Sequence, residues 1–166
     1  ISLHYVSKLA REHVVVCLSG EGSDEMFAGY DFYRYNLAIE KARRIFGGGL
    51  FHRLRGLTAK IGRFAKFHKY LELAGNSLEE RYRGISSYEQ GKKTSLYSSN
   101  FSGRAAEGNV SCNAFIEGLF ARSQHWDPLS RMLYFDTKTW LVDDLLIKAD
   151  RMSMANSIEL RVPFLD

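Results

Sequence analysis

Cysteine and proline are both scarce in this chain of 166 residues, which holds two of each. Cys17 and Cys112 are far apart and form no Cys-x-x-Cys pair, so neither a zinc site nor a disulfide framework is supported. Cys17 lies in an apolar run, where cysteine is typically a small buried hydrophobe. A reducing, cytoplasmic setting is the simplest interpretation.

Long apolar runs are also missing, since no stretch approaches the roughly 20 apolar residues of a membrane-spanning helix. No signal peptide is visible. The hydrophobic fraction of 45% and the charged fraction of 25% are typical of a globular protein and argue against disorder. The chain starts at Ile1 and stops at Asp166, directly after an apolar Pro-Phe-Leu, so we expect both ends to be cut from a longer protein.

Acidic residues are absent from residues 41–69, although lysine and arginine occur throughout that stretch. Phe51, Phe64 and Phe67 are interleaved with these basic residues. Such a pattern is typical of a solvated helix with an aromatic core face. It also fits a surface for nucleic acid or for an anionic membrane. The solvated helix is the simpler of these interpretations.

The hydrophobic pattern predicts an α/β order of elements. Residues 2–12 have the spacing of an amphipathic helix. Residues 13–18 form an unbroken β-branched run, which suits a strand buried on both faces of a parallel sheet. A polar loop at 19–25 follows, and helical spacing then continues over 24–46. Helix, strand, glycine loop and helix together indicate an α/β protein.

Downstream, the three glycines at 47–49 should break the helix. Further elements are expected in this order: helices at 50–67 and 77–87, a loop at 90–109 and a helix at 111–122. Another helix should start at Asp127-Pro128, because proline is tolerated in the first turn. It should continue to Ser157 with a break near Val142. About one strand is predicted, so the chain should be predominantly helical.

The loop at residues 19–25 (Ser-Gly-Glu-Gly-Ser-Asp-Glu) is the segment most suited to chemistry. Ligands of open parallel sheets bind beyond the carboxyl ends of the strands. Gly20 and Gly22 permit close approach of the backbone, and N–H groups of such a turn converge on phosphate oxygens. The acids Glu21 and Asp24 fit beside phosphate if Mg²⁺ lies between them.

Two common phosphate-binding patterns are absent from this loop, the Walker A motif and the three-glycine dinucleotide fingerprint. A simpler interpretation is a tight turn from strand to helix. In that case Asp24 and Glu25 only complement the dipole of the first helical turn. Spacing alone leaves both interpretations open.

Two segments carry a family resemblance. Residues 19–30 (Ser-Gly-Glu-Gly-Ser-Asp-Glu-Met-Phe-Ala-Gly-Tyr) closely resemble the Ser-Gly-Glu-Gly-(Ala/Ser)-Asp-Glu-(Leu/Val)-Phe-Gly-Gly-Tyr signature of glutamine-hydrolysing asparagine synthetases. Residues 143–166 are similar to the family block Asp-x-x-x-Lys-x-Asp-Arg-x-Ser-Met-Ala-x-x-x-Glu-x-Arg-x-Pro-Phe-Leu-Asp. The two motifs occur in the family's order, and residues 46–124 between them carry no recognised motif.

The resemblance implies a synthetase domain of the adenine-nucleotide α-hydrolase (ATP-pyrophosphatase) type, of which residues 1–166 form an internal fragment. It implies that Ser19 and Gly20 contact ATP and that Gly22 belongs to the same ATP-binding turn. Glu21 would lie where the acyl-adenylate forms and where ammonia loses its proton. Asp24 would bind Mg²⁺ on the pyrophosphate.

The implied reaction activates the β-carboxylate of aspartate with ATP and then replaces AMP with ammonia to give asparagine. Ammonia would come from glutamine, hydrolysed in an N-terminal glutaminase domain outside this chain. The family's pyrophosphate loop is absent too, so we expect the chain alone to be inactive. A sheet without its preceding strands exposes an edge, so we also expect a homo-oligomer.

The second block suggests further roles. Asp144, or Asp143 beside it, would help to orient ammonia or the adenylate, or would simply be an acid at a helix start. Three charged residues allow i,i+3 ion pairs, namely Lys148, Asp150 and Arg151. Three small or apolar residues are candidates either for a narrow ammonia passage or for core packing, namely Ala149, Ala155 and Val162. Glu159 and Arg161 precede Pro163 in a predicted extended segment, where they would form an ion pair or contact the substrate.

Other functions remain open at this stage. Related amidotransferases and β-lactam synthetases share the implied fold. The latter have tyrosine at the position of Glu21, so Glu21 favours ammonia chemistry. The basic stretch at 41–69 alternatively suggests a nucleic-acid-binding module, whose binding would depend steeply on salt. A helical interaction module with an inactive loop is a third alternative, against which Glu21 and Asp24 weigh.

Overall fold

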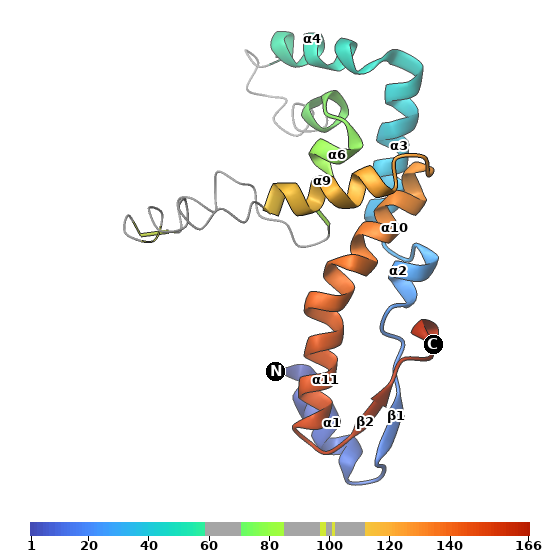
Figure 1. Cartoon of the computed structure of the whole chain (residues 1–166), viewed down its shortest axis with the longest axis vertical. Helices are drawn as coiled ribbons and strands as arrows, with labels where there is room; N and C mark the ends of the chain where they lie inside the picture. Colours follow the sequence, from blue (N-terminus) through green and yellow to red (C-terminus); the bar gives the residue numbers. More distant parts are fainter. Residues whose placement is uncertain (59–70, 85–96, 99–100, 102–111) are drawn as a thin grey trace. The chain divides into compact units, whose positions relative to one another are not determined.

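The computed structural model describes residues 1–58, 71–84, 97–98, 101 and 112–166. The chain divides into two compact units. One combines residues 1–38 with residues 128–166, and the other consists of residues 39–127. Figure 1 shows the elements of both.

The first unit is built on a two-stranded parallel sheet. Its elements are α1 (Ser2–Arg11), β1 (Val16–Leu18), α2 (Ser23–Phe27), the first half of α3 (Asp31–Phe46), α10 (Pro128–Lys138), the π-helix η2 (Leu141–Leu146), α11 (Ile147–Met154), β2 (Glu159–Arg161) and the short 3-10 helix η3 (Pro163–Leu165). In the sheet, Val16 lies opposite Glu159 and Leu18 opposite Arg161. α11 packs on α1 and β2, beside the strands (Figure 1). The extended segment at 159–161 is therefore a second strand, where about one was predicted.

The valine-rich run differs from its prediction in length and in burial. β1 covers only the last three residues of the predicted strand at 13–18. Val15 is 57% exposed and Leu18 is 74% exposed, because β1 pairs with β2 alone and no further layer covers it within the described residues. The prediction of a strand buried on both faces is wrong for this chain. Cys17 is half-buried rather than buried.

The predicted helix at 24–46 is two helices. Ala28 adopts a left-handed conformation with φ +58°, which ends α2 before α3 begins at Asp31. α3 ends at Phe46, where Gly47 has φ +75°, so the predicted break at the glycines is confirmed. Local propensity favoured one continuous helix, and the turn at residues 28–30 interrupts it.

The helical stretch after Asp127 agrees with its prediction. α10 begins at Pro128, and the irregularity expected near Val142 is the π-helix η2. π-helical turns are rare and frequently occur at functional sites. The core of this unit is formed by buried apolar side chains, namely Tyr33, Met132, Phe135, Leu141 and Ile158.

The second unit, as far as it is described, contains the rest of α3 and α4 (Gly48–Thr58), α6 (Leu78–Arg81) and α9 (Cys112–Arg122). Ser77 caps α6, since its hydroxyl accepts a hydrogen bond from the Glu80 N–H and Glu80 in turn accepts from the Ser77 N–H. The expected helix at 111–122 is confirmed. The helix expected at 77–87 is shorter than predicted, because Tyr82 adopts an extended backbone and ends α6 at Arg81. The end of the helix expected at 50–67 and most of the loop expected at 90–109 lie outside the described residues.

Part of the basic stretch at 41–69 has a structural role. Arg43 donates a hydrogen bond to the carbonyl oxygen of Ala74 at 2.7 Å. Glu40 lies 2.7 Å from the guanidinium of Arg81, whose side chain is 1% exposed. Among the described helices, none is long and apolar enough to cross a membrane.

Candidate functional site

The two motif segments lie against each other. The N–H of Ser19 donates a hydrogen bond to the carbonyl oxygen of Arg161 at 2.9 Å, and the N–H of Glu159 donates to that of Val15 at 2.8 Å. Residues 19–25 therefore begin where β1 leaves its pairing with β2. Because both strands run in the same direction, the loop lies at the carboxyl end of the pair, where α/β sheets bind ligands.

The segment after β2 anchors this loop. Gly22 has φ +87°, and a Cβ added to it would lie 2.6 Å from Cδ2 of Leu165. The rings of Phe27 and Phe164 meet edge to face at 5.8 Å between centroids. The Pro-Phe-Leu of the second motif thus packs on both ends of the segment from Gly22 to Phe27.

The predicted nucleotide-contact residues are close together in this loop. The N–H of Glu21 donates to Oγ of Ser19 at 3.3 Å, which closes the turn. Gly20 is exposed, and an added Cβ there would meet no heavy atom within 4 Å. Gly22 is buried, so of the two glycines only Gly20 offers its backbone to a ligand in this chain. Glu21 is half-buried.

Asp24 lies in the first turn of α2 and folds over Gly29. An added Cβ at Gly29 would collide with Oδ1 of Asp24, so only glycine leaves room for the carboxylate in this position. Within the described residues, no group of three or more His, Cys, Asp or Glu side chains is placed to hold a metal. A single carboxylate is nevertheless what Mg²⁺ takes from a protein when phosphate oxygens and water supply the rest.

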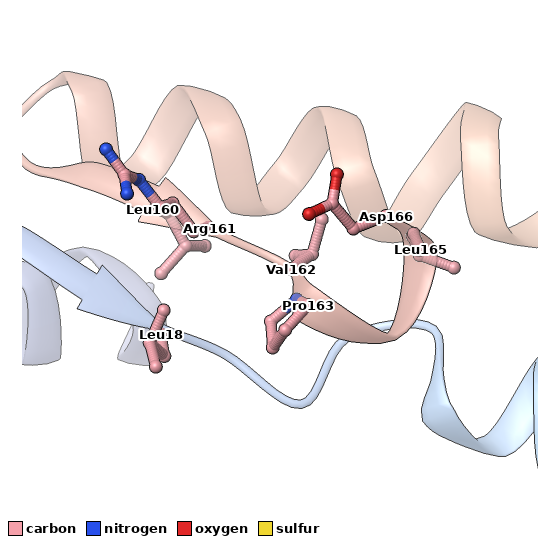
Figure 2. Close-up of a pocket in the computed structure, with 7 residues that line it drawn as sticks. All are labelled: Leu18, Leu160, Arg161, Val162, Pro163, Leu165 and Asp166. Carbon is pink, nitrogen blue, oxygen red and sulfur yellow. The ribbon is translucent and has the colours of Figure 1, made fainter.

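A pocket of about 530 Å³ opens at the carboxyl ends of the strands (Figure 2). Its lining comes from the end of β1 and from β2 and the residues that follow, namely Leu18, Leu160, Arg161, Val162, Pro163, Leu165 and Asp166. Val162, one of the candidates for an ammonia passage, lies here, whereas Ala149 is 2% exposed in the core and Ala155 is exposed. Glu21 and Asp24 are not among the lining residues.

Arg161 is the basic residue of that pocket. Its Nε lies 2.8 Å from Oε1 of Glu159, so the predicted Glu–Arg pair is present. Both side chains are more than half exposed, so the pair adds little stability and the guanidinium stays exposed to solvent.

Asp144 is separate from this loop. It lies on η2 and forms an ion pair with Lys148 at 3.1 Å, at i,i+4 spacing. No contact joins Asp144 to Glu21 or Asp24 in the described part of the chain. The predicted i,i+3 pairs among Lys148, Asp150 and Arg151 are not seen, because the two residues three apart, Lys148 and Arg151, are both basic.

Two carboxyl groups are buried, although the sequence predicted only a helix-dipole role for Glu25 and no role for Asp136. Glu25 is 1% exposed and accepts a hydrogen bond from the Tyr30 hydroxyl at 2.7 Å. Asp136 is 0% exposed and accepts from the Tyr33 hydroxyl at 2.6 Å. Burial raises the pKa of both hydroxyls, and the bonded carboxyl groups raise it further. Asp136 falls on an apolar face of α10, beside Met132 and Phe135, and that spacing is the signal in the sequence that was missed.

Comparison with known proteins agrees with the two motifs. The family model described as asparagine synthase matches residues 1–166. Asparagine synthetase [glutamine-hydrolyzing] 1 of Bacillus subtilis (strain 168) is 38% identical over 167 residues, which cover 100% of this chain and 25% of the relative. A putative asparagine synthetase [glutamine-hydrolyzing] of Mycobacterium bovis is 36% identical over 173 residues, covering 100% of this chain and 24% of the relative.

A more distant relative, amidase chyE of Penicillium rubens, is 30% identical and covers 92% of this chain and 24% of its own length. No solved structure matches. The chain spans about a quarter of the length of the curated relatives it matches. These matches do not favour the nucleic-acid-binding alternative. The chain, from residue 1 to residue 166 and with both motifs, belongs to the asparagine synthase family.

Proposed function

We propose that this chain is part of the synthetase domain of a longer enzyme (the full-length protein) and that this enzyme makes asparagine from aspartate, glutamine and ATP. One observation carries this proposal: the loop at 19–25 lies at the carboxyl end of a parallel strand pair, packed against the Pro-Phe-Leu of the second motif. The parallel pair with helices beside it is compatible with an adenine-nucleotide α-hydrolase domain, of which the chain would be a part.

The reaction proceeds in two steps. A β-carboxylate oxygen of aspartate attacks the α-phosphorus of ATP, and the bond to the bridging oxygen breaks to release pyrophosphate. Ammonia then attacks the acyl carbon of β-aspartyl-AMP, AMP leaves, and asparagine forms. Backbone groups of Ser19 and Gly20, with Gly22 shaping the turn, hold the nucleotide. Glu21 accepts the proton that the attacking ammonia loses.

Asp24 is the residue that would hold Mg²⁺, because its carboxylate stands in the first turn of α2 beside the loop. When bound, the metal neutralises charge on the pyrophosphate leaving group. Gly29 keeps the carboxylate in place by leaving it room.

Asp144 is a second candidate for orienting ammonia or the adenylate. Support comes from its place on the π-helix, and its ion pair with Lys148 fixes the carboxylate at the surface of η2. Substitution of Asp144 by Asn is expected to lower asparagine formation more than pyrophosphate release.

The remaining parts of the proposal concern partners and setting. An N-terminal glutaminase domain would supply ammonia, and the enzyme would act in the cytoplasm. Within the described residues β1 has a strand beside it on one edge alone, and its other edge supports self-association, because such an edge offers N–H and C=O groups to another chain. A clean monomer of this chain by light scattering would count against the oligomer.

Product analysis with aspartate, glutamine and ATP tests the proposed reaction. The full-length protein should release pyrophosphate and form asparagine, whereas this chain alone should release none. Glu21→Gln and Asp24→Asn should each abolish most of the activity. Pyrophosphate release with another carboxylate, but not with aspartate, would assign the protein to a related amidotransferase.

A further inference from the structure

We propose that Glu25 and Tyr30 form a positioning pair, which holds α2 and the preceding loop in the orientation that the reaction needs. The inference rests on the function proposed above. Neither side chain is assigned to substrate, so Tyr30 acts through Glu25 and α2.

α2 requires anchors from outside itself. It has only five residues, and its N-cap is Gly22, which has no side chain to cap the helix. The residues flanking it, Gly22 and Ala28, both have left-handed backbones. Isolated helices of this length are not stable in water, so tertiary contacts decide where α2 points.

One of these anchors is the segment after β2, through Leu165 and Phe164. A second is α10, which packs on α2, and a third is Glu25, which is 1% exposed. A buried carboxylate is unfavourable unless it is hydrogen-bonded, and the Tyr30 hydroxyl donates to it at 2.7 Å. Without that donor, α2 is expected to shift and let water reach Glu25. Asp24, which directly precedes Glu25 in the chain, would move with α2.

The pair is also connected to the helices of the second motif. The ring of Tyr30 lies 5.9 Å from that of Tyr33, measured between centroids. Trp140, directly before η2, lowers the pKa of the Tyr30 hydroxyl, against the rise that burial and Glu25 cause. Nζ of Lys148, the partner of Asp144, is 6.0 Å from the centre of the Trp140 ring. Lys148 thus contacts both the Trp140 ring and Asp144 on η2.

A second pair of the same chemistry serves as a control. The Tyr33 hydroxyl donates to buried Asp136 at 2.6 Å. This bond joins α3 to α10, so neither of its partners belongs to the loop or to α2, although α10 packs on α2. Tyr30→Phe and Tyr33→Phe remove the same atom from neighbouring sites. A purely structural role predicts similar consequences for both.

The experiment compares these two variants in the full-length protein, with pyrophosphate release and melting temperature as readouts. Tyr30→Phe is expected to lower kcat about tenfold and to raise severalfold the Mg²⁺ concentration for half-maximal rate, with the KM for aspartate changed less than about twofold. Tyr33→Phe is expected to lower the melting temperature at least as much while keeping kcat within about twofold. Glu25→Gln should retain more activity than Glu25→Ala, because an amide oxygen still accepts from Tyr30.

Amide hydrogen exchange over residues 19–27 gives a readout that requires no activity. Exchange there should become faster in Tyr30→Phe and stay unchanged in Tyr33→Phe. If the wild-type full-length protein is inactive, the proposed function is rejected, and the exchange measurement alone decides whether Glu25 and Tyr30 hold the loop in place. Equal losses of kcat in both variants, or unchanged exchange in Tyr30→Phe, would overturn the positioning role.

Discussion

Leu165 fills the space beside the α-carbon of Gly22, so that two residues of different motifs, at opposite ends of the chain, meet in one contact. A Cβ at position 22 would lie 2.6 to 3.0 Å from three carbon atoms of the Leu165 side chain. The glycine has φ +87°, which other residues rarely adopt. This contact fixes where the loop after β1 lies relative to the segment after β2.

Gly22→Ala is expected to destabilise the protein, because the methyl group overlaps Leu165 and the backbone is left-handed. Each effect is worth roughly 1–2 kcal/mol. Urea unfolding measures the change. Gly20→Ala is the matched control in the same loop, since an added Cβ there meets nothing within 4 Å. In a Leu165→Ala background the overlap should disappear and only the backbone penalty remain. A penalty that is the same in both backgrounds would contradict the contact.

Ala28→Gly is expected to stabilise the protein by about 0.5–1 kcal/mol, although glycine raises the conformational entropy of the unfolded chain. The reason is that Ala28 has φ +58°, where its Cβ is strained. Ala155→Gly is the control, because Ala155 follows α11 in the same way but with φ −59°. That substitution should destabilise slightly. Melting temperatures that fall in both variants would show that residue 28 is not left-handed in solution.

Gly29→Ala is expected to displace the Asp24 carboxylate with little loss of stability, less than about 1 kcal/mol, since a flexible side chain can move aside. If Asp24 holds the metal, the full-length variant should need several times more Mg²⁺ for half-maximal pyrophosphate release. Titration of the rate with Mg²⁺ at saturating ATP measures this. Ala28→Gly, one residue away, should leave the Mg²⁺ requirement unchanged. An unaltered requirement in Gly29→Ala would argue that Asp24 is not the ligand.

Alkaline pH is expected to destabilise the first unit through its buried tyrosines. Burial, together with the hydrogen bond to Asp136, raises the pKa of Tyr33 well above its ordinary value of 10.0. Above pH 10 the unfolded chain therefore loses a proton that the folded chain keeps, so the free energy of unfolding falls as pH rises. Below pH 10 this contribution is fully present.

The variant that tests this effect is Tyr33→Phe. Its free energy of unfolding should be lower than that of the wild type at pH 7, by about 1–3 kcal/mol, because buried Asp136 loses a donor. Its further decline between pH 9 and pH 11 should be shallower, since the group that titrates is gone. Urea unfolding at several pH values provides the measurement. Parallel declines in the two proteins would show that Tyr33 does not titrate as inferred.

Much of the local structure follows from the sequence. The helices at Ser2–Arg11 and Cys112–Arg122 agree with the predicted spans within a residue, because their apolar periodicity is a local signal. The helix at Pro128–Lys138 begins at the predicted proline, which is also a local signal, and ends before the break expected near Val142. The two motifs predicted the family. A dozen residues of one loop, and the block around Pro163, carry enough specific side chains to be recognised without any coordinates.

Tertiary structure decided the features that depend on partners distant in sequence. Glu159–Arg161 is a strand because Val16–Leu18 lies beside it, and no pattern within three residues of mixed polarity indicates that. α2 ends at Phe27 because the chain turns at Ala28 to bring Tyr30 over Glu25. The burial of Glu25 is likewise not indicated by the sequence, since a buried carboxylate depends on the hydroxyl that donates to it, here that of Tyr30. Sequence thus determined which chemistry the chain is suited to, whereas packing across more than 100 residues decided how its loop is held.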